Sequence, residues 1–229
     1  DNYYWGLCTL YILDGMEGVD KEEIVAYLHE CQCVNGGFGG NPTQKPHVEE
    51  TLSALQVLVL LNRMEEFDLT GIPQWISSLQ LPNGAIIGHD GGEADTKFCY
   101  CALAILKLLD RMDAINQENI IKWILSCRNY DGGFGCFPGC ESHSGQIFTS
   151  LAALSLCNAL DRVDKGPLIL WLSERQTLKG GVNGRPEKEP DVCYAWWTGA
   201  SLAILGALDC IDADKLEEFV LQAQSDHGG

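Results

Sequence analysis

This chain of 229 residues is poor in positive charge and has no long apolar segment. It carries 15 Lys and Arg against 32 Asp and Glu, a net charge of −17, which argues against nucleic acid and anionic membrane surfaces as general partners. No apolar run approaches the roughly 20 residues that a transmembrane helix needs, and no signal segment opens the sequence. We therefore expect a cytoplasmic protein that holds any anionic ligand with a local basic cluster.

The cysteines lack the arrangement of an extracellular disulfide framework. Their number, 11, is odd, and several, such as Cys99 and Cys157, lie within apolar segments, which is typical of reduced core residues. The chain also lacks an initiating methionine, opens within the aromatic run DNYYWG and stops at a glycine pair. We expect one domain over residues 1–229 that is incomplete at both ends.

A period of 48 residues organises the rest of the sequence. An aromatic residue recurs at this spacing, at Tyr27, Trp75, Trp123, Trp171 and Phe219. Each is followed by Gln or Arg and then by a glycine turn such as NGG from Asn35, where Gly permits the positive φ that ends a helix. Polar residues that could begin the next helix share the period, at His47, Asp95, His143 and Asp191.

Each period contains two helical stretches of different character. The residues of 144–160 and 191–208 are apolar almost all round, as in helices covered on every side. The stretches 20–31 and 213–223 are apolar on one face only and would form an outer layer. Because a hairpin of this kind cannot bury its apolar face alone, we predict an all-α fold, an α/α toroid of five helical hairpins, with a plain solenoid as the alternative.

The densest group of reactive side chains lies in 183–197, NGRPEKEPDVCYAWW. Two cations, Arg185 and Lys188, precede Asp191 and Cys193. Alone, Asp191 fits a helix N-cap, and an Asp-x-Cys pair is a weak zinc motif because zinc usually has three or four protein ligands. A carboxylate and a thiol beside two cations and paired tryptophans are hard to explain as core packing, so we expect a functional site here.

His143, in GCFPGCESHSGQ, has the same repeat phase as Asp191 and should lie at the same end of the helices, either as a helix start or as part of the site. Cys136 and Cys140 with His143 could suggest a second zinc site. The counterpart turn in 35–47 has no cysteine, which argues against it. Aromatic residues on the inner helices would either fill the centre of a toroid or line a tunnel for a long apolar ligand.

Four segments together resemble the β subunit of protein prenyltransferases: NGRPEKEPDVCYAWW, GCFPGCESHSGQ, YWG at 4–6 and the repeated Q-x-x-NGGFGG turn. The PDVCY segment, the Trp196–Trp197 pair and E-S-H-x-G-Q are most similar to the Rab geranylgeranyltransferase (type II) branch. The resemblance implies a toroid of six hairpins, a partner α subunit, one catalytic zinc, geranylgeranyl diphosphate as lipid donor, and Rab-type GTPases presented by an escort protein.

The resemblance also implies roles for particular residues. Asp191 and Cys193 would be zinc ligands, and the third ligand, a His in a sixth hairpin, is expected beyond Gly229. Without it we expect the chain to bind zinc weakly. The diphosphate would be held by a protonated His143 and by Arg185, Lys188 and Tyr194. The prenyl tunnel would be lined by Trp5, Leu52, Tyr100 and Trp197, with Trp196 close by.

The implied reaction is attack of a zinc-bound acceptor thiolate on C1 of the lipid diphosphate. Leu52, and Asp1 at another position that lines the tunnel in this family, favour a C20 chain over a shorter one. Two other functions stay open: a toroid that binds lipid or acts as a scaffold without catalysis, and a type I or farnesyl-transferring β subunit. A terpenoid-cyclase-like enzyme is disfavoured because the sequence has no D-x-D-D or D-D-x-x-D cluster.

Overall fold

The computed structural model describes residues 2–225, and this part of the chain is helical. It contains ten α-helices: α1 Asn2–Ile12, α2 Lys21–Cys31, α3 Val48–Leu61, α4 Ile72–Ser78, α5 Thr96–Leu108, α6 Gln117–Ser126, α7 Ser144–Leu156, α8 Lys165–Ser173, α9 Cys193–Leu205 and α10 Ala213–Gln222. Within the described residues, β pairing is limited to isolated bridges next to the glycine turns. The all-α prediction is confirmed.

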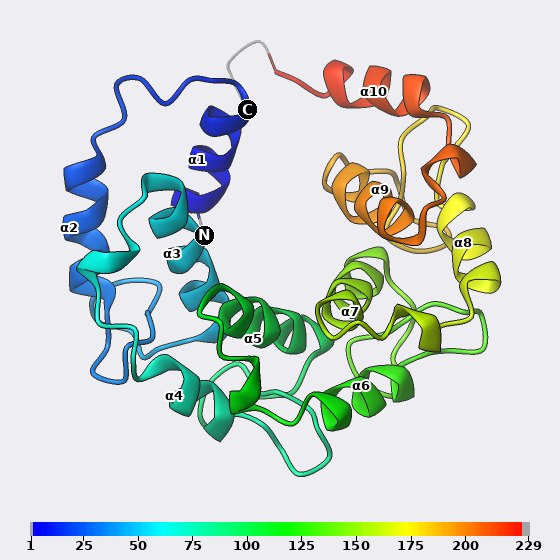
Figure 1. Cartoon of the computed structure of the whole chain (residues 1–229). Helices are drawn as coiled ribbons and strands as arrows, with labels where there is room; N and C mark the ends of the chain where they lie inside the picture. The colour runs from blue at the N-terminus through cyan, green and yellow to red at the C-terminus, as the bar shows by residue number, and fades with distance from the viewer. Residues whose placement is uncertain (1, 226–229) are drawn as a thin grey trace. The chain divides into compact units, whose positions relative to one another are not determined.

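The chain divides into two compact units, one ending at Gln117 and the other beginning at Glu118. In the first unit α3 lies between α1 and α5, and α2 packs against α3 (Figure 1). In the second unit α7 and α9 lie side by side, and α8 packs against α9. In each unit, therefore, long apolar helices pack together and a further helix, α2 or α8, packs against one of them.

The long apolar helices begin in a similar way at each repeat, with the polar residue as the N-cap of α3, α5 and α7 and one residue before the N-cap of α9. The side chains of His47, Asp95, His143 and Asp191 each accept a hydrogen bond from the backbone N–H two residues later. Such caps satisfy amide groups that have no partner inside the helix. The polar residues of the 48-residue period are thus helix starts, as predicted, and the side chains next to them are presented at that end of the helix.

The ends of these helices also follow the period, through residues with left-handed backbone. Asn62 and Gly206 form the C-caps of α3 and α9 with φ of 58° and 73°, and Asp110 and Asn158 take φ of 54° after α5 and α7. Asn, Asp and Gly tolerate this conformation better than other residues. A one-turn 3₁₀ helix follows each time, as at Leu160–Arg162 (η3).

The recurring Gln or Arg ties each repeat to the next. The Gln176 amide donates to the carbonyl of Asp212 at 2.8 Å, and its oxygen accepts from the Asp212 N–H at 2.8 Å. Gln80 makes the same pair of bonds with Asn116, at 2.9 Å each. Gln32 and Arg128 donate to the carbonyls of Asp68 and Asp164. Every partner lies 36 residues ahead, just before the next outer helix.

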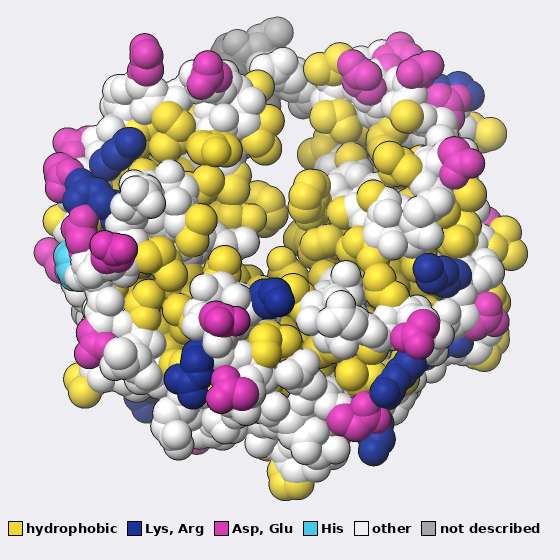
Figure 2. All heavy atoms as spheres, viewed as in Figure 1, with side chains coloured by type: hydrophobic (Ala, Val, Ile, Leu, Met, Phe, Trp, Pro, Cys, Tyr) yellow, Lys and Arg dark blue, Asp and Glu magenta, His cyan; other side chains and the backbone are white. Residues whose placement is uncertain are grey.

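The acidic side chains lie mainly on the outer elements. Glu22 and Glu23 on α2 and Asp214 and Glu217 on α10 are exposed, and Figure 2 shows acidic groups gathered over both helices. α7, in contrast, buries residues on all sides, from Ser144 to Leu154. No helix within residues 2–225 has both the length and the apolar composition to cross a membrane.

Candidate functional site

The residues of the predicted diphosphate and metal site lie in the second unit. All except the Lys188 side chain are grouped at the amino ends of α7 and α9. His143 immediately precedes α7, and Cys193 and Tyr194 open α9. The loop between α8 and α9 carries Arg185 and Lys188. The 48-residue period explains this meeting, because it places the starts of α7 and α9 at equivalent positions of neighbouring hairpins.

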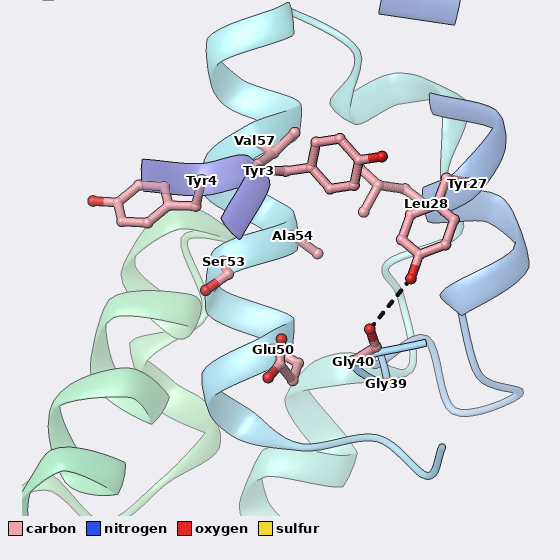
Figure 3. A pocket seen from close by; sticks show the side chains of 10 residues that line it. All are labelled: Tyr3, Tyr4, Tyr27, Leu28, Gly39, Gly40, Glu50, Ser53, Ala54 and Val57. Atoms are coloured by element: carbon pink, nitrogen blue, oxygen red, sulfur yellow. Dashed lines mark hydrogen bonds between the residues drawn. The ribbon is translucent and has the colours of Figure 1, made fainter. Parts of the chain in front are cut away.

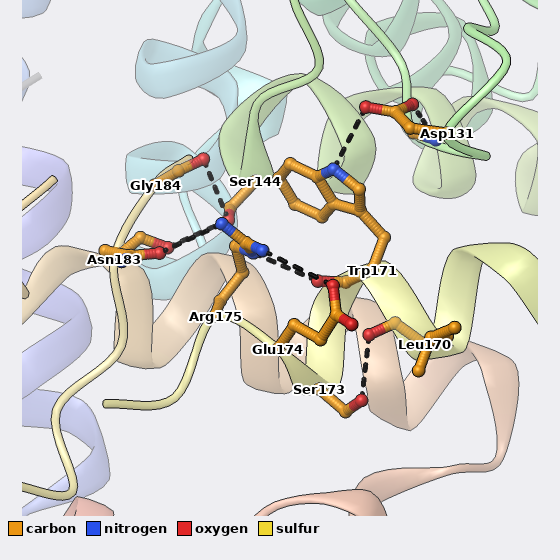
Figure 4. A network of polar contacts seen from close by, with 10 residues as sticks. Asp131, Ser144, Leu170, Trp171, Ser173, Glu174, Arg175, Asn183 and Gly184 are labelled. Atoms are coloured by element: carbon orange, nitrogen blue, oxygen red, sulfur yellow. Dashed lines mark hydrogen bonds and ion pairs between the residues drawn. The ribbon is translucent and has the colours of Figure 1, made fainter. Parts of the chain in front are cut away.

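A buried polar network holds this loop in place (Figure 4). Arg175 is 5% exposed, stacks on Trp171 with 4.5 Å between guanidinium carbon and ring centroid, and lies 3.5 Å from Asn183 Oδ1. The Asn183 amide donates to the Lys188 carbonyl at 3.0 Å, which closes the turn that contains Arg185. Since an unpaired buried guanidinium is costly, these contacts fix the loop.

The start of α7 is bound to the same loop. The Ser144 hydroxyl donates to the carbonyl of Gly184 at 3.2 Å, and the Ser144 N–H donates to the same oxygen at 2.8 Å. A side chain at Gly184 would overlap the Tyr194 ring, so glycine is required for the ring to lie there. The loop, α7 and α9 therefore form one rigid frame around His143 and Tyr194.

His143 is a neutral imidazole with a defined tautomer. Its Nδ1 accepts the N–H of Gly145 at 3.1 Å, so the ring proton must be on Nε2. Nε2–H then donates to the Tyr194 hydroxyl oxygen at 3.2 Å, leaving the Tyr194 hydrogen free for another acceptor. Burial, and then the charge of Arg185, lowers the His143 pKa. Nδ1 therefore carries no hydrogen while it caps α7, and a protonated His143 beside a bound diphosphate stays a prediction.

Asp191 and Cys193 lie together, as a shared metal ion requires. Asp191 Oδ1 accepts the Cys193 N–H at 2.9 Å, which lowers the Asp191 pKa, as does a hydrogen bond from the thiol. Partial desolvation raises the Cys193 pKa to about 11, and the bond to Asp191 adds to it. Carboxylate oxygen and thiolate sulfur are both zinc ligands, so the pair fits two positions of a zinc site. Within residues 2–225 no group of three or more His, Cys, Asp and Glu side chains is placed to hold a metal.

The two cations are presented differently. Arg185 is paired with Glu141 through NH1, and its charge acts on both His143 and Tyr194. Lys188 is held by its backbone, and its side chain is exposed. Glu141 was not predicted from the sequence, although it lies within E-S-H. Arg175 was not predicted either. Its position at the end of the apolar helix α8 is the sequence feature that could have indicated a buried cation.

Aromatic residues of the second unit gather next to this site. Phe148 on α7 lies 5.2 Å from Trp197 and 6.1 Å from Trp196 between ring centroids. Trp196 is 57% exposed and lines a cavity of about 530 Å³ with apolar residues of α9 and α10, among them Ala203 and Leu216. The two predicted tunnel tryptophans are thus neighbours on α9.

The other predicted tunnel residues belong to the first unit. Trp5 on α1 is 50% exposed, Leu52 on α3 is buried, and Tyr100 on α5 lies close enough to Tyr4 for their phenols to interact. Asp1 lies outside the described residues. The tunnel stays a prediction, since three of its residues are in one unit and two are in the other.

The first unit also has a separate cavity of about 310 Å³ between α1, α2 and α3. Tyr3 and Tyr27 face it with 5.7 Å between ring centroids, and Glu50 lies below them (Figure 3). Trp5, Leu52 and Tyr100 do not line this cavity, so it is not the predicted prenyl tunnel.

The first unit repeats part of the geometry of the site. His47 caps α3 and lies 5.4 Å from the Phe98 ring, edge to face, as His143 lies 5.5 Å from the Tyr194 ring. Phe98 has no hydroxyl, however, and Lys97 stands where Cys193 stands two repeats later. The contact between the capping histidine and the ring is therefore a property of the repeat. The thiol, the phenol and the cations Arg185 and Lys188 distinguish the second unit, since His89 and Gly92 stand two repeats before the cations.

Both the sequence and the fold are similar to those of known proteins. Residues 2–229 match the family described as "Prenyltransferase alpha-alpha toroid domain". A stretch of 56 residues is 48% identical to the "Probable geranylgeranyl transferase type-2 subunit beta" of Dictyostelium discoideum, covering 24% of this chain and 16% of that protein. A stretch of 55 residues is 49% identical to the type-2 subunit beta 1 of Arabidopsis thaliana, covering 24% and 17%.

Among solved structures, the fold is similar to that of the Candida albicans protein geranylgeranyltransferase-I complexed with GGPP. The TM-score is 0.86 at 24% sequence identity, over 99% of this chain and 76% of that one. The matched stretches span less than a fifth of the length of the two curated relatives. At 24% sequence identity, the similarity to the solved structure establishes the fold alone.

Proposed function

Because this chain belongs to the prenyltransferase α/α-toroid family, we propose that it is the catalytic β subunit of a zinc-dependent protein geranylgeranyltransferase of type II. With an α subunit, it transfers a C20 prenyl group from geranylgeranyl diphosphate to C-terminal cysteines of Rab-type GTPases, presented by an escort protein in the cytoplasm. The type-2 relatives support this specificity. The single observation that carries the proposal is the meeting of Asp191 and Cys193 with His143, Arg185 and Tyr194 at one end of α7 and α9.

The anion-directed groups of the site suit a departing diphosphate. As the C1–O bond of the lipid breaks, negative charge develops on the diphosphate oxygens, and donors fixed in advance stabilise it most. Arg185 and Lys188 provide positive charge, while the His143–Tyr194 hydrogen bond directs the Tyr194 hydrogen outward. The frame around Arg175 and Asn183 holds the loop that carries the cations, so little reorganisation is needed when the anion binds.

Asp191 and Cys193 would hold the zinc ion as two of its ligands. A bound zinc ion supplies a positive charge that ionises the acceptor thiol at neutral pH. The acceptor sulfur then forms the C–S bond to C1 while the diphosphate leaves with the electron pair of the C–O bond.

The prenyl chain would lie against the inner-helix aromatics. Trp196, Trp197 and Phe148 provide apolar surface directly next to the diphosphate groups. Burying each CH₂ group contributes about 0.8 kcal/mol, so a C20 chain supplies ample binding energy.

The test is transfer of radiolabel from geranylgeranyl diphosphate to a Rab-type GTPase, with the chain assembled with its α subunit and the escort protein present. We expect Cys193→Ser to reduce transfer at least 100-fold, because a serine hydroxyl is a poor zinc ligand. Cys210→Ser is the matched control, since Cys210 is also an exposed free thiol but lies outside the site. Equal loss in both variants, or normal transfer by Cys193→Ser, would contradict the proposal.

A further inference from the structure

Glu141 is an acidic side chain within a group of residues that otherwise attracts anions. It lies three residues before α7, and its carboxylate pairs with NH1 of Arg185, 44 residues later in the chain. The side chains of Arg185 and Glu141 are 42% and 58% exposed. An anion arriving from solvent can therefore reach this pair.

The charge of Glu141 also acts beyond the pair. After burial, the charges that act on the His143 pKa are Arg185, which lowers it, and Glu141, which raises it. Arg185 acts in turn on Tyr194. Glu141 is thus paired with Arg185, and its charge acts on His143. Arg185 in turn acts on Tyr194, so three of the four groups that would hold the diphosphate are linked to Glu141.

We propose that Glu141 is an internal counter-ion of Arg185, whose place on the guanidinium is taken by a diphosphate when it binds. This inference rests on the proposed function. Carboxylate and phosphate oxygens bind the same donors of a guanidinium, so the two compete for Arg185. Because an exposed ion pair is weak, displacing Glu141 from Arg185 lowers the affinity for the diphosphate by a factor of about five at most. The return of Glu141 to Arg185 would favour release of the product diphosphate.

The probe is inorganic pyrophosphate, titrated calorimetrically into the chain at 0.1 M salt. We expect Glu141→Gln to lower the dissociation constant three- to fivefold, since it removes the competing carboxylate and keeps the shape of the side chain. A melting curve and a circular dichroism spectrum confirm that the variant is folded.

The second unit offers a matched control. Glu118 pairs with Arg162, also 44 residues later, at 2.9 Å. Arg162 lies in η3 after the carboxyl end of α7, about 20 Å along the helix from Glu141. Because this exceeds the Debye length of roughly 10 Å, Glu118→Gln should change the dissociation constant by less than about a factor of two.

A double-variant comparison tests whether Glu141 acts through Arg185. In an Arg185→Ala background, Glu141→Gln should have no more effect than Glu118→Gln. The inference is overturned if Glu141→Gln and Glu118→Gln have equal effects in the wild-type background, or if Glu141→Gln weakens binding.

The same titrations separate this inference from the proposed function. If the wild-type chain does not bind pyrophosphate, or if Arg185→Ala binds it as tightly as wild type, the proposed diphosphate site is wrong and this inference with it. If Arg185→Ala weakens binding while Glu141→Gln behaves like Glu118→Gln, only the role of Glu141 is wrong.

Discussion

Single residues show how one contact serves both folding and chemistry in this protein. His47 and His143 occupy helix N-cap positions that more often carry Ser, Thr, Asp or Asn, and both accept an amide hydrogen on Nδ1. This bond requires a neutral ring, and burial lowers the pKa of both residues. The cap that begins α7 thereby fixes the tautomer of His143 that faces Tyr194.

We expect the stability of the chain to fall as the pH drops below about 6.5, the ordinary pKa of histidine. His47 and His143 have folded-state pKa values below their unfolded values, so the unfolded chain binds more protons and is favoured as the pH decreases through this range. Urea unfolding midpoints at pH 7.5 and 5.5 measure the effect. In a His47→Asn/His143→Asn variant, which keeps the caps without titrating, the difference should shrink; an unchanged difference would refute this explanation.

Substitutions of Asp191 should separate its role in the helix from its role at the metal. Asp191→Asn keeps an acceptor for the Cys193 N–H, so the free energy of unfolding should change by less than about 0.5 kcal/mol, whereas Asp191→Ala should cost about 1 kcal/mol. Both should lower zinc affinity, because an amide oxygen is a poor zinc ligand. Denaturation and zinc competition titrations measure the two effects. Loss of stability without loss of zinc affinity would reduce Asp191 to a helix cap.

At the scale of elements, the sequence predicted the helices well and the links between them poorly. The stretch 144–160 was expected to be helical and α7 covers Ser144–Leu156, because a continuous apolar run and a polar start are local properties. The left-handed residues after these helices were not foreseen, since Asn62, Asp110 and Gly206 differ in type while sharing a backbone. The sequence also could not show that the recurring Gln reaches a carbonyl 36 residues away, because this contact depends on how neighbouring hairpins pack.

Parts of the site were predictable because they follow the repeat. His143 and Asp191 share the repeat phase, so their placement at equivalent helix starts followed from the period. The pairing of Arg185 with Glu141 did not follow, because it joins two loops whose conformations depend on buried partners such as Arg175 and Asn183. The neutral form of His143 likewise depends on a cap geometry that residue type alone does not reveal.

Removing one of the inter-repeat bonds should weaken the second unit measurably. Gln176→Ala deletes the bonds to Gly180 and Asp212, and at about 0.5–1.5 kcal/mol per hydrogen bond we expect a loss near 2 kcal/mol. Gln222→Ala is the control, since Gln222 bonds to an exposed glutamate on its own helix and should cost less than about 0.5 kcal/mol. Chemical denaturation followed by far-ultraviolet circular dichroism measures both. Similar losses would show that the bond between repeats contributes little.

Two glycines of the second unit should respond in opposite directions to alanine. Gly180 has φ of +90°, and a Cβ there would overlap the Lys215 carbonyl, so Gly180→Ala should cost more than about 2 kcal/mol. Gly199 lies within α9, and a Cβ added there would meet no neighbouring side chain within 4 Å, so Gly199→Ala should stabilise by up to about 1 kcal/mol. Thermal melts of both variants test the pair. Equal shifts of the melting temperature would contradict the assigned backbone conformations.

At the scale of the whole molecule, the strong acidity and the proposed anionic ligand are compatible because they involve different elements. The net charge is −17, and acidic side chains cover outer helices such as α2 and α10 (Figure 2). This field opposes the general binding of polyanions. A diphosphate must therefore be held by the local donors of the second unit, Arg185 and Lys188 in particular, together with apolar contacts of its lipid.

The most direct test of this account is a comparison of geranylgeranyl diphosphate with geranylgeraniol, which has the same lipid without the diphosphate. Titration of the chain, followed by its tryptophan fluorescence, to which Trp196 and Trp197 contribute, gives both affinities. The account predicts that the diphosphate binds at least about 100-fold more tightly, and that Arg185→Ala with Lys188→Ala removes most of this difference. Equal affinity for the diphosphate and the alcohol, or an undiminished difference in the double variant, would contradict the central claim.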